Sequence, residues 1–173
     1  MLAFLTQTTG WWSGVLHPVQ GLEHLTTMLL VGALAGLGTL AGRSPWRAPL
    51  TCVLGLSVGS LLAAAGVVVP DPRWLLVVIA VALAGLLFVI DRVARPLPAI
   101  TLVVGLLHGL AHAQALASSE RPVPFLAGSL FTACVAIACG GVVGLTIARS
   151  ALDRRAIRVV AVAPAPVAQR RAA

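Results

Sequence analysis

The sequence predicts an all-α fold, a polytopic membrane bundle of about five transmembrane helices with the amino terminus outside and the carboxy terminus inside. Three observations lead to this prediction. Hydrophobic residues make up 59% of the 173 residues, and the mean hydropathy is +1.01. Charged residues make up only 10%, against roughly 25% in an ordinary soluble domain. The charged residues are also absent from five long runs, and the arginines between these runs are distributed unevenly.

The charge-free runs set the predicted helices. They cover residues 24–42, 48–70, 74–90, 96–119 and 122–148, each near or above the roughly 18 apolar residues of a candidate span. We expect helices over about residues 21–41, 48–69, 73–90, 97–117 and 125–148. Residues 1–16 would form an outer amino-terminal segment and residues 17–149 the transmembrane bundle. Residues 150–173 would form a disordered, basic cytoplasmic tail.

The arginines predict the orientation. The net charge of +7 comes entirely from arginine, because the chain has no lysine. With the amino terminus outside, ten arginines fall in inner segments and two in outer ones, which matches the excess of positive charge on the inner side of membrane proteins. We therefore expect a multi-pass protein of the cell membrane with the lipid bilayer as a partner. Nucleic acid is not expected, because the arginines lie in short gaps and the tail rather than on one soluble face.

The start of the first run concentrates potential metal ligands. His17, Glu23, His24 and Met28 fall within twelve residues, although the chain has only four histidines and two glutamates. His24 and Met28 are four apart and share a helix face, whereas His17 needs a turn at Pro18 or Gly21 to reach it. Glu23 is also consistent with a dipole-favoured residue at a helix start, and Met28 with a core residue.

The fourth run carries the other two histidines. His108 and His112 are four apart, so both imidazoles share one helix face. With the predicted orientation, His112 lies about 7 Å and His108 about 13 Å below the outer end, at 1.5 Å per residue. His24 also lies in the outer half, so a shared site between the first and fourth helices is geometrically allowed. A buried histidine can simply bond a neighbouring helix, but ionisable residues within membrane spans favour a functional role.

These motifs resemble a known family. The pattern H-P-x-x-G-x-E-H from His17, with Met28 four residues on, resembles the first-helix signature of the HupE/UreJ-type hydrogenase and urease accessory nickel permeases, which usually have Asp at the position of Glu23. The pattern from His108 to His112 resembles the second signature, on the family's fourth helix. The resemblance covers about residues 10–148. It implies an inner-membrane protein that takes up nickel or cobalt from the periplasmic side, with these metal-pathway residues: His17, Glu23, His24, His108 and His112.

Several function classes stay open from the sequence. A metal permease, not an enzyme, is favoured, with nickel or cobalt and also zinc as candidate ions and Met28 as an additional ligand; no resident cofactor is expected. Its small size argues for facilitated passage or a homo-oligomer, and no nucleotide-binding motif is present. The alternatives are a haem-binding membrane protein with histidine axial ligands, a membrane zinc enzyme, or a divergent family member without transport, since Ala115 stands where the second signature commonly has Glu.

Overall fold

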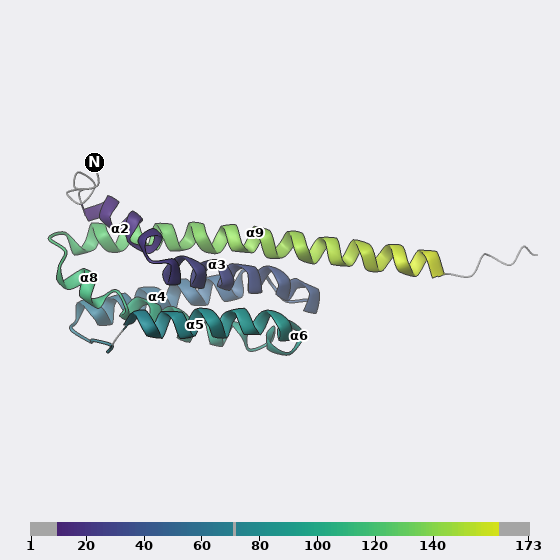
Figure 1. Cartoon of the computed structure of the whole chain (residues 1–173), viewed down its shortest axis with the longest axis horizontal. Coiled ribbons are helices and arrows are strands. Elements are labelled where there is room, and N and C mark those ends of the chain that lie inside the picture. Colours follow the sequence, from purple (N-terminus) through teal and green to yellow (C-terminus); the bar gives the residue numbers. More distant parts are fainter. Residues whose placement is uncertain (1–9, 71, 163–173) are drawn as a thin grey trace, which may run out of the picture.

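The computed structural model describes residues 10–70 and 72–162, and within these ranges the chain forms helices and no strand (Figure 1). The helices are α2 (Gly10–Gln20), α3 (Leu22–Leu37), η1 (Gly38–Ala41), α4 (Arg47–Ala64), α5 (Pro72–Leu86), η2 (Leu87–Val89), α6 (Ile90–Val93), α7 (Leu97–Leu110), α8 (Ala113–Ala117) and α9 (Pro122–Val162).

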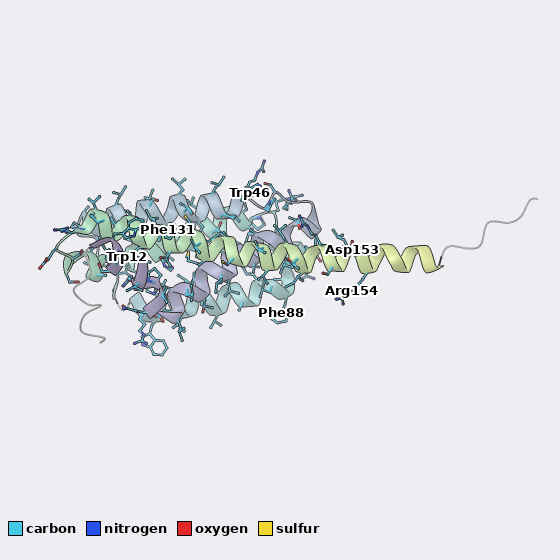
Figure 2. All side chains as sticks on the ribbon, turned by 90° about the horizontal axis from the view of Figure 1, so that it is seen from above. Trp12, Trp46, Phe88, Phe131, Asp153 and Arg154 are labelled. Carbon is cyan, nitrogen blue, oxygen red and sulfur yellow. The ribbon has the colours of Figure 1, made fainter. Side chains whose placement is uncertain are left out.

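Five helical stretches are long and apolar enough to cross a membrane. They are Leu22–Ala41, Arg47–Ala64, Arg73–Val93, Leu97–Ala117 and Pro122–Arg154. Large apolar side chains project outward along the bundle, including Trp12, Phe88 and Phe131 (Figure 2). In water so much exposed apolar surface would be unfavourable, whereas in a bilayer it faces lipid. The predicted all-α class with about five spanning helices is confirmed, and the orientation in the membrane remains a prediction.

Small residues allow the helices to pack at close range. α4 packs along α7, and α3 packs along α9. A Cβ on Gly59 would overlap the carbonyl of Leu106, and a Cβ on Gly32 would overlap the carbonyl of Ile137. Lipid supplies no hydrophobic drive for helix association, so close backbone contact and van der Waals packing must supply it. The pair of glycines four apart in the second predicted helix, Gly55 and Gly59, lies at this α4–α7 contact.

Helix α2 lies outside the five candidate spans and packs on α9. The hydroxyl of Ser129 donates to the carbonyl of Gly14 at 3.1 Å, and that of Thr132 donates to the carbonyl of Val15 at 2.9 Å. A Cβ on Gly14 would overlap the backbone of Phe125, so the two helices are in direct contact. Residues 10–16 of the predicted outer segment are therefore helical and attached to the bundle, and residues 1–9 lie outside the described residues.

The last helix is longer than the sequence predicted. We expected it to end at residue 148 and a disordered tail to start at residue 150, but α9 continues to Val162 and extends beyond the other helices (Figure 1). Residues 149–162 contain no glycine or proline, and they are rich in alanine and arginine, which favour helix. The first helix breaker after the span is Pro164. The rest of the predicted tail, residues 163–173, lies outside the described residues.

Two other predicted helices are interrupted. The third comprises α5, η2 and α6, and the fourth divides into α7 and α8 around Ala111 and His112. The buried apolar core lies between α3, α4, α5, α7 and α9 and includes Met28, Leu56 and Leu76. The α2 and α8 end of the bundle, where the histidines lie, is opposite the end that carries α6 (Figure 1).

Candidate metal centre

A break in the helix at Gly21 brings the first two histidines together. α2 ends at Gln20, α3 begins at Leu22, and Gly21 between them has extended backbone angles of φ −106° and ψ 103°. The ring centroids of His17 and His24 are consequently 5.2 Å apart. A Cβ on Gly21 would lie 2.7 Å from Nδ1 of His24, so the absence of a side chain leaves room for that imidazole. The structure thus supplies at Gly21 the turn that His17 requires.

A helix end positions the second pair. His108 lies in the last turn of α7, which ends at Leu110. The backbone N–H of His112 donates to the carbonyl of Gly109 at 3.1 Å, so the chain tightens there into a turn of three residues. His112 nevertheless stays on the same side as His108, and their ring centroids are 5.5 Å apart.

The two pairs meet in one cluster, which we call the histidine centre: His17, His24, His108 and His112. The ring of His24 lies 4.8 Å from that of His108 and 5.5 Å from that of His112. The ring of His17 lies 5.0 Å from that of His112. His24, His108 and His112 are buried, and His17 is partly buried. Four imidazoles therefore share one small volume, and they come from two stretches that are distant in sequence: the consecutive helices α2 and α3, and the end of α7 with the turn after it.

The nitrogens of three of these residues are close to metal-binding geometry. One ligand nitrogen from each of His17, His24 and His112 lies within 4.8 Å of the other two. With metal–nitrogen bonds of about 2.1 Å, two ligands of one ion can be separated by at most about 4.2 Å. The cluster is thus slightly more open than a coordinated set, and a contraction of about 0.6 Å or less would close it.

Several imidazole nitrogens in the centre have no hydrogen-bond partner. Among the described residues these buried orphans are His17 Nε2, His24 Nδ1 and Nε2, His108 Nδ1 and His112 Nδ1. An unsatisfied buried polar atom costs about 1–3 kcal/mol, and each unsatisfied group in a folded protein requires an explanation. Coordination of an ion would satisfy one nitrogen of each imidazole that binds it, because an imidazole binds metal through an unprotonated nitrogen.

Glu23 lies beside the cluster rather than within the group of three. Its Oε1 is 3.8 Å from Nδ1 of His24 and 3.7 Å from Nε of Arg73, whose side chain is 82% exposed. A carboxylate next to a ligand histidine commonly fixes the orientation of the ring and raises its basicity. The charge of Glu23 also acts on His17. Burial lowers the pKa of His17, and Glu23 opposes this effect only in part.

Two neighbours of the centre were not predicted from the sequence. The ring of Phe125, at the start of α9, lies 5.3 Å from His17 and 6.4 Å from His112. Arg73, one of the two arginines that fall in predicted outer segments, pairs with Glu23. The sequence contained a signal for this pairing. Glu23 lies near the start of the first predicted helix and Arg73 at the start of the third, and both starts are predicted to face the outer side. Met28 is fully buried in the apolar core, which fits the packing role that the sequence left open beside ligation.

The geometry does not favour the haem alternative. A haem would need a slot for its macrocycle between two axial imidazoles. The rings of His24 and His112 are only 5.5 Å apart, and the rings of His17 and His108 lie directly beside both of them. Side chains therefore occupy the volume that a macrocycle would need.

Comparison with known proteins agrees with the motifs. The family model described as HupE / UreJ protein matches residues 3–168. Protein HupE from Rhizobium leguminosarum bv. viciae is 32% identical over 121 residues, which are 68% of this chain and 61% of that relative. The match thus spans less than two thirds of the length of the relative. No solved structure matches the chain.

The helices, the two histidine motifs and the match over nearly the whole sequence lead to the same conclusion. The chain belongs to the HupE/UreJ family of membrane proteins, which are permease-like accessory proteins linked to nickel and cobalt uptake for hydrogenase and urease.

Proposed function

We propose that this chain binds a divalent nickel or cobalt ion at the histidine centre and passes it inward across the cell membrane. The observation that supports this most directly is the convergence of four imidazoles with buried, unpartnered nitrogens in a family linked to these metals. Imidazole is a borderline ligand that suits nickel and zinc, and preference between such ions depends on geometry and availability more than on raw affinity.

The order of the imidazoles suggests a path with two overlapping positions. His17 contacts His24 and His112, and His108 contacts the same two rings. An ion held by His17, His24 and His112 can therefore move to His24, His108 and His112 by exchanging one ligand. His17 lies on α2, outside the candidate spans, and His108 lies within one of them. This exchange would carry the ion from the edge of the bundle into it.

Glu23 serves in this proposal as a positioning residue and a source of negative charge. Its carboxylate faces Nδ1 of His24, so it would orient that ring while Nε2 meets the ion. The side chain is only 14% exposed, and its attraction for a cation is therefore screened less than that of a surface carboxylate. Arg73 neutralises part of this charge until a metal ion arrives.

Metal uptake by cells tests the proposal. His24→Ala and His112→Ala should each abolish uptake of nickel or cobalt, while the folded protein remains in the membrane. Parallel measurements with nickel, cobalt and zinc would identify the preferred ion. Normal uptake by both variants would overturn the proposal. A visible absorbance band of the purified protein would instead favour the haem alternative.

The control variant should remove a polar group that is remote from the centre. Thr146→Ala on α9 is suitable, because its exposed hydroxyl donates only within its own helix, to the carbonyl of Val142. Thr101 is unsuitable, although it lies on α7. Its buried hydroxyl bonds the carbonyl of Ala48 at 2.9 Å across the α4–α7 interface, so its loss would affect packing.

A further inference from the structure

A cavity of about 250 Å³ is lined by residues at the end of the bundle that carries α6. In Figure 1, α6 lies at the opposite end from α2 and α8, which flank the histidine centre. The walls of the cavity come from the end of α3 and η1 with the turn that follows, the first turn of α4, and the start of α7 with the residues just before it. The cavity therefore lies where two inter-helix connections meet. The proposed metal path does not account for it.

Three arginines line this cavity: Arg43, Arg47 and Arg95. All three are exposed, and none of the lining residues is acidic. Within the part of the chain that the structure describes, both ion pairs involve Glu23, so these guanidinium groups have no carboxylate partner there. Three unpaired positive charges around one hollow repel each other, and an anion bound between them would relieve this repulsion.

The backbone adds to the positive character of the site. α4 begins at Arg47 and α7 at Leu97, and neither helix has a side-chain cap. Ala48 and Leu97, in the first turns of these helices, line the cavity. The first backbone N–H groups of a helix lack intrahelical partners and carry the positive end of its dipole, which favours anions. The two helix starts add to the positive potential of the cavity, and the three arginines supply most of it.

We propose that this cavity binds a phosphate group. A guanidinium presents paired N–H donors that match two phosphate oxygens, and arginine is weakly hydrated enough to bind them at an interface. Trp46, next to Arg47 in sequence, is 71% exposed at this end of the molecule (Figure 2). Exposed tryptophans of membrane proteins commonly lie at the level of lipid headgroups. The phosphate can thus belong to an anionic lipid or be free in solution, and the test separates the two sources.

The experiment uses the full chain purified in a neutral detergent. One arm measures retention of phosphatidylglycerol, with phosphatidylcholine as the reference lipid, by native mass spectrometry. The other arm measures thermal unfolding with inorganic phosphate against chloride at equal ionic strength. The test variant is R43Q/R47Q/R95Q, and the matched control is R92Q/R149Q/R154Q, which removes three exposed arginines outside the cavity.

We expect the test variant to bind its phosphate ligand at least about tenfold more weakly than the wild type, because it loses the charged groups that donate hydrogen bonds to the phosphate oxygens. The control should bind like the wild type. Binding of phosphatidylglycerol alone identifies a lipid headgroup, and stabilisation by inorganic phosphate identifies a free anion. Equal binding by the test variant and the wild type, or no binding in either arm, would overturn the proposal. R95Q alone carries the comparison if the triple variant does not fold. Nickel uptake plays no part in this test, so the phosphate-binding proposal can fail or succeed independently of the proposed transport.

Discussion

Replacing His108 by leucine should stabilise the metal-free protein and weaken metal binding, two effects of opposite sign. His108 is 1% exposed, and its Nδ1 has no hydrogen-bond partner. An orphaned buried polar atom costs about 1–3 kcal/mol, and leucine fills a similar volume without a polar atom. The metal-free His108→Leu variant should therefore gain up to about 1–3 kcal/mol relative to the wild type, less any cost of imperfect packing.

Thermal unfolding in detergent, monitored by circular dichroism with and without nickel, measures both effects. Nickel at a hundredfold excess over its Kd should stabilise the wild type by about 2.7 kcal/mol. The variant should gain less at the same concentration, because it retains only the position formed by His17, His24 and His112. Thr146→Val, on the exposed side of α9, should behave like the wild type in both conditions. The reasoning would be refuted by a variant that is less stable without metal and still gains the full nickel-dependent stabilisation.

Three further outcomes are expected. Gly21→Ala should weaken nickel binding about tenfold or more in calorimetry with the fold intact, because the new Cβ would lie 2.7 Å from Nδ1 of His24 and displace a ligand ring; unchanged affinity would argue against that ring position. Nickel uptake should fall with acidification, because protonated imidazole cannot bind metal. Since burial lowers the pKa of His17, this histidine stays neutral to a lower pH than a free histidine, whose pKa is about 6.5. Uptake that is already half lost at pH 6.5 or above would therefore contradict this assignment. A carboxy-terminal reporter that is active only in the periplasm should be inactive, and activity would reverse the orientation predicted from the arginines.

The sequence predicted the five long apolar helices well because the bilayer imposes a simple rule. A segment without charge that is long enough to cross must satisfy its backbone internally, so it forms a helix. The sequence also indicated that His108 and His112 lie close together, because residues four apart share a helix face. The pair remains together even though α7 ends between them, since the turn at Ala111 departs little from helical geometry.

The interruptions and the length of the last helix were not predictable in the same way. Hydropathy identifies a span but not the end of a helix, because a helix can continue beyond the apolar run. α9 does this through residues 149–162, where charges are frequent but no residue breaks the helix before Pro164. The prediction of a disordered tail from residue 150 was wrong for residues 150–162, because the end of a charge-free run does not require the end of a helix.

The position of His17 depends on contacts that no local pattern contains. It is carried by α2, and α2 is attached to α9 through the bonds from Ser129 and Thr132, which join residues 115 and 117 positions apart. Neither serine nor threonine has a sequence signal for this role, because each is common in membrane helices.

The same contacts show why a helix without histidine matters to the histidine centre. α9 holds α2 through Ser129 and Thr132, packs closely against α3 at Gly32, and places Phe125 against His17 and His112. α3 carries His24, so one helix fixes the supports of two of the four imidazoles and contacts a third. Metal affinity depends on ligand positions to within a few tenths of an ångström, and a site assembled from three segments keeps that precision only if something rigid joins them. In this chain α9 is the helix that packs against both α2 and α3, while the histidines lie on α2, on α3 and at the end of α7 with the turn after it. The histidine motifs alone therefore identify the candidate site without explaining how it is held.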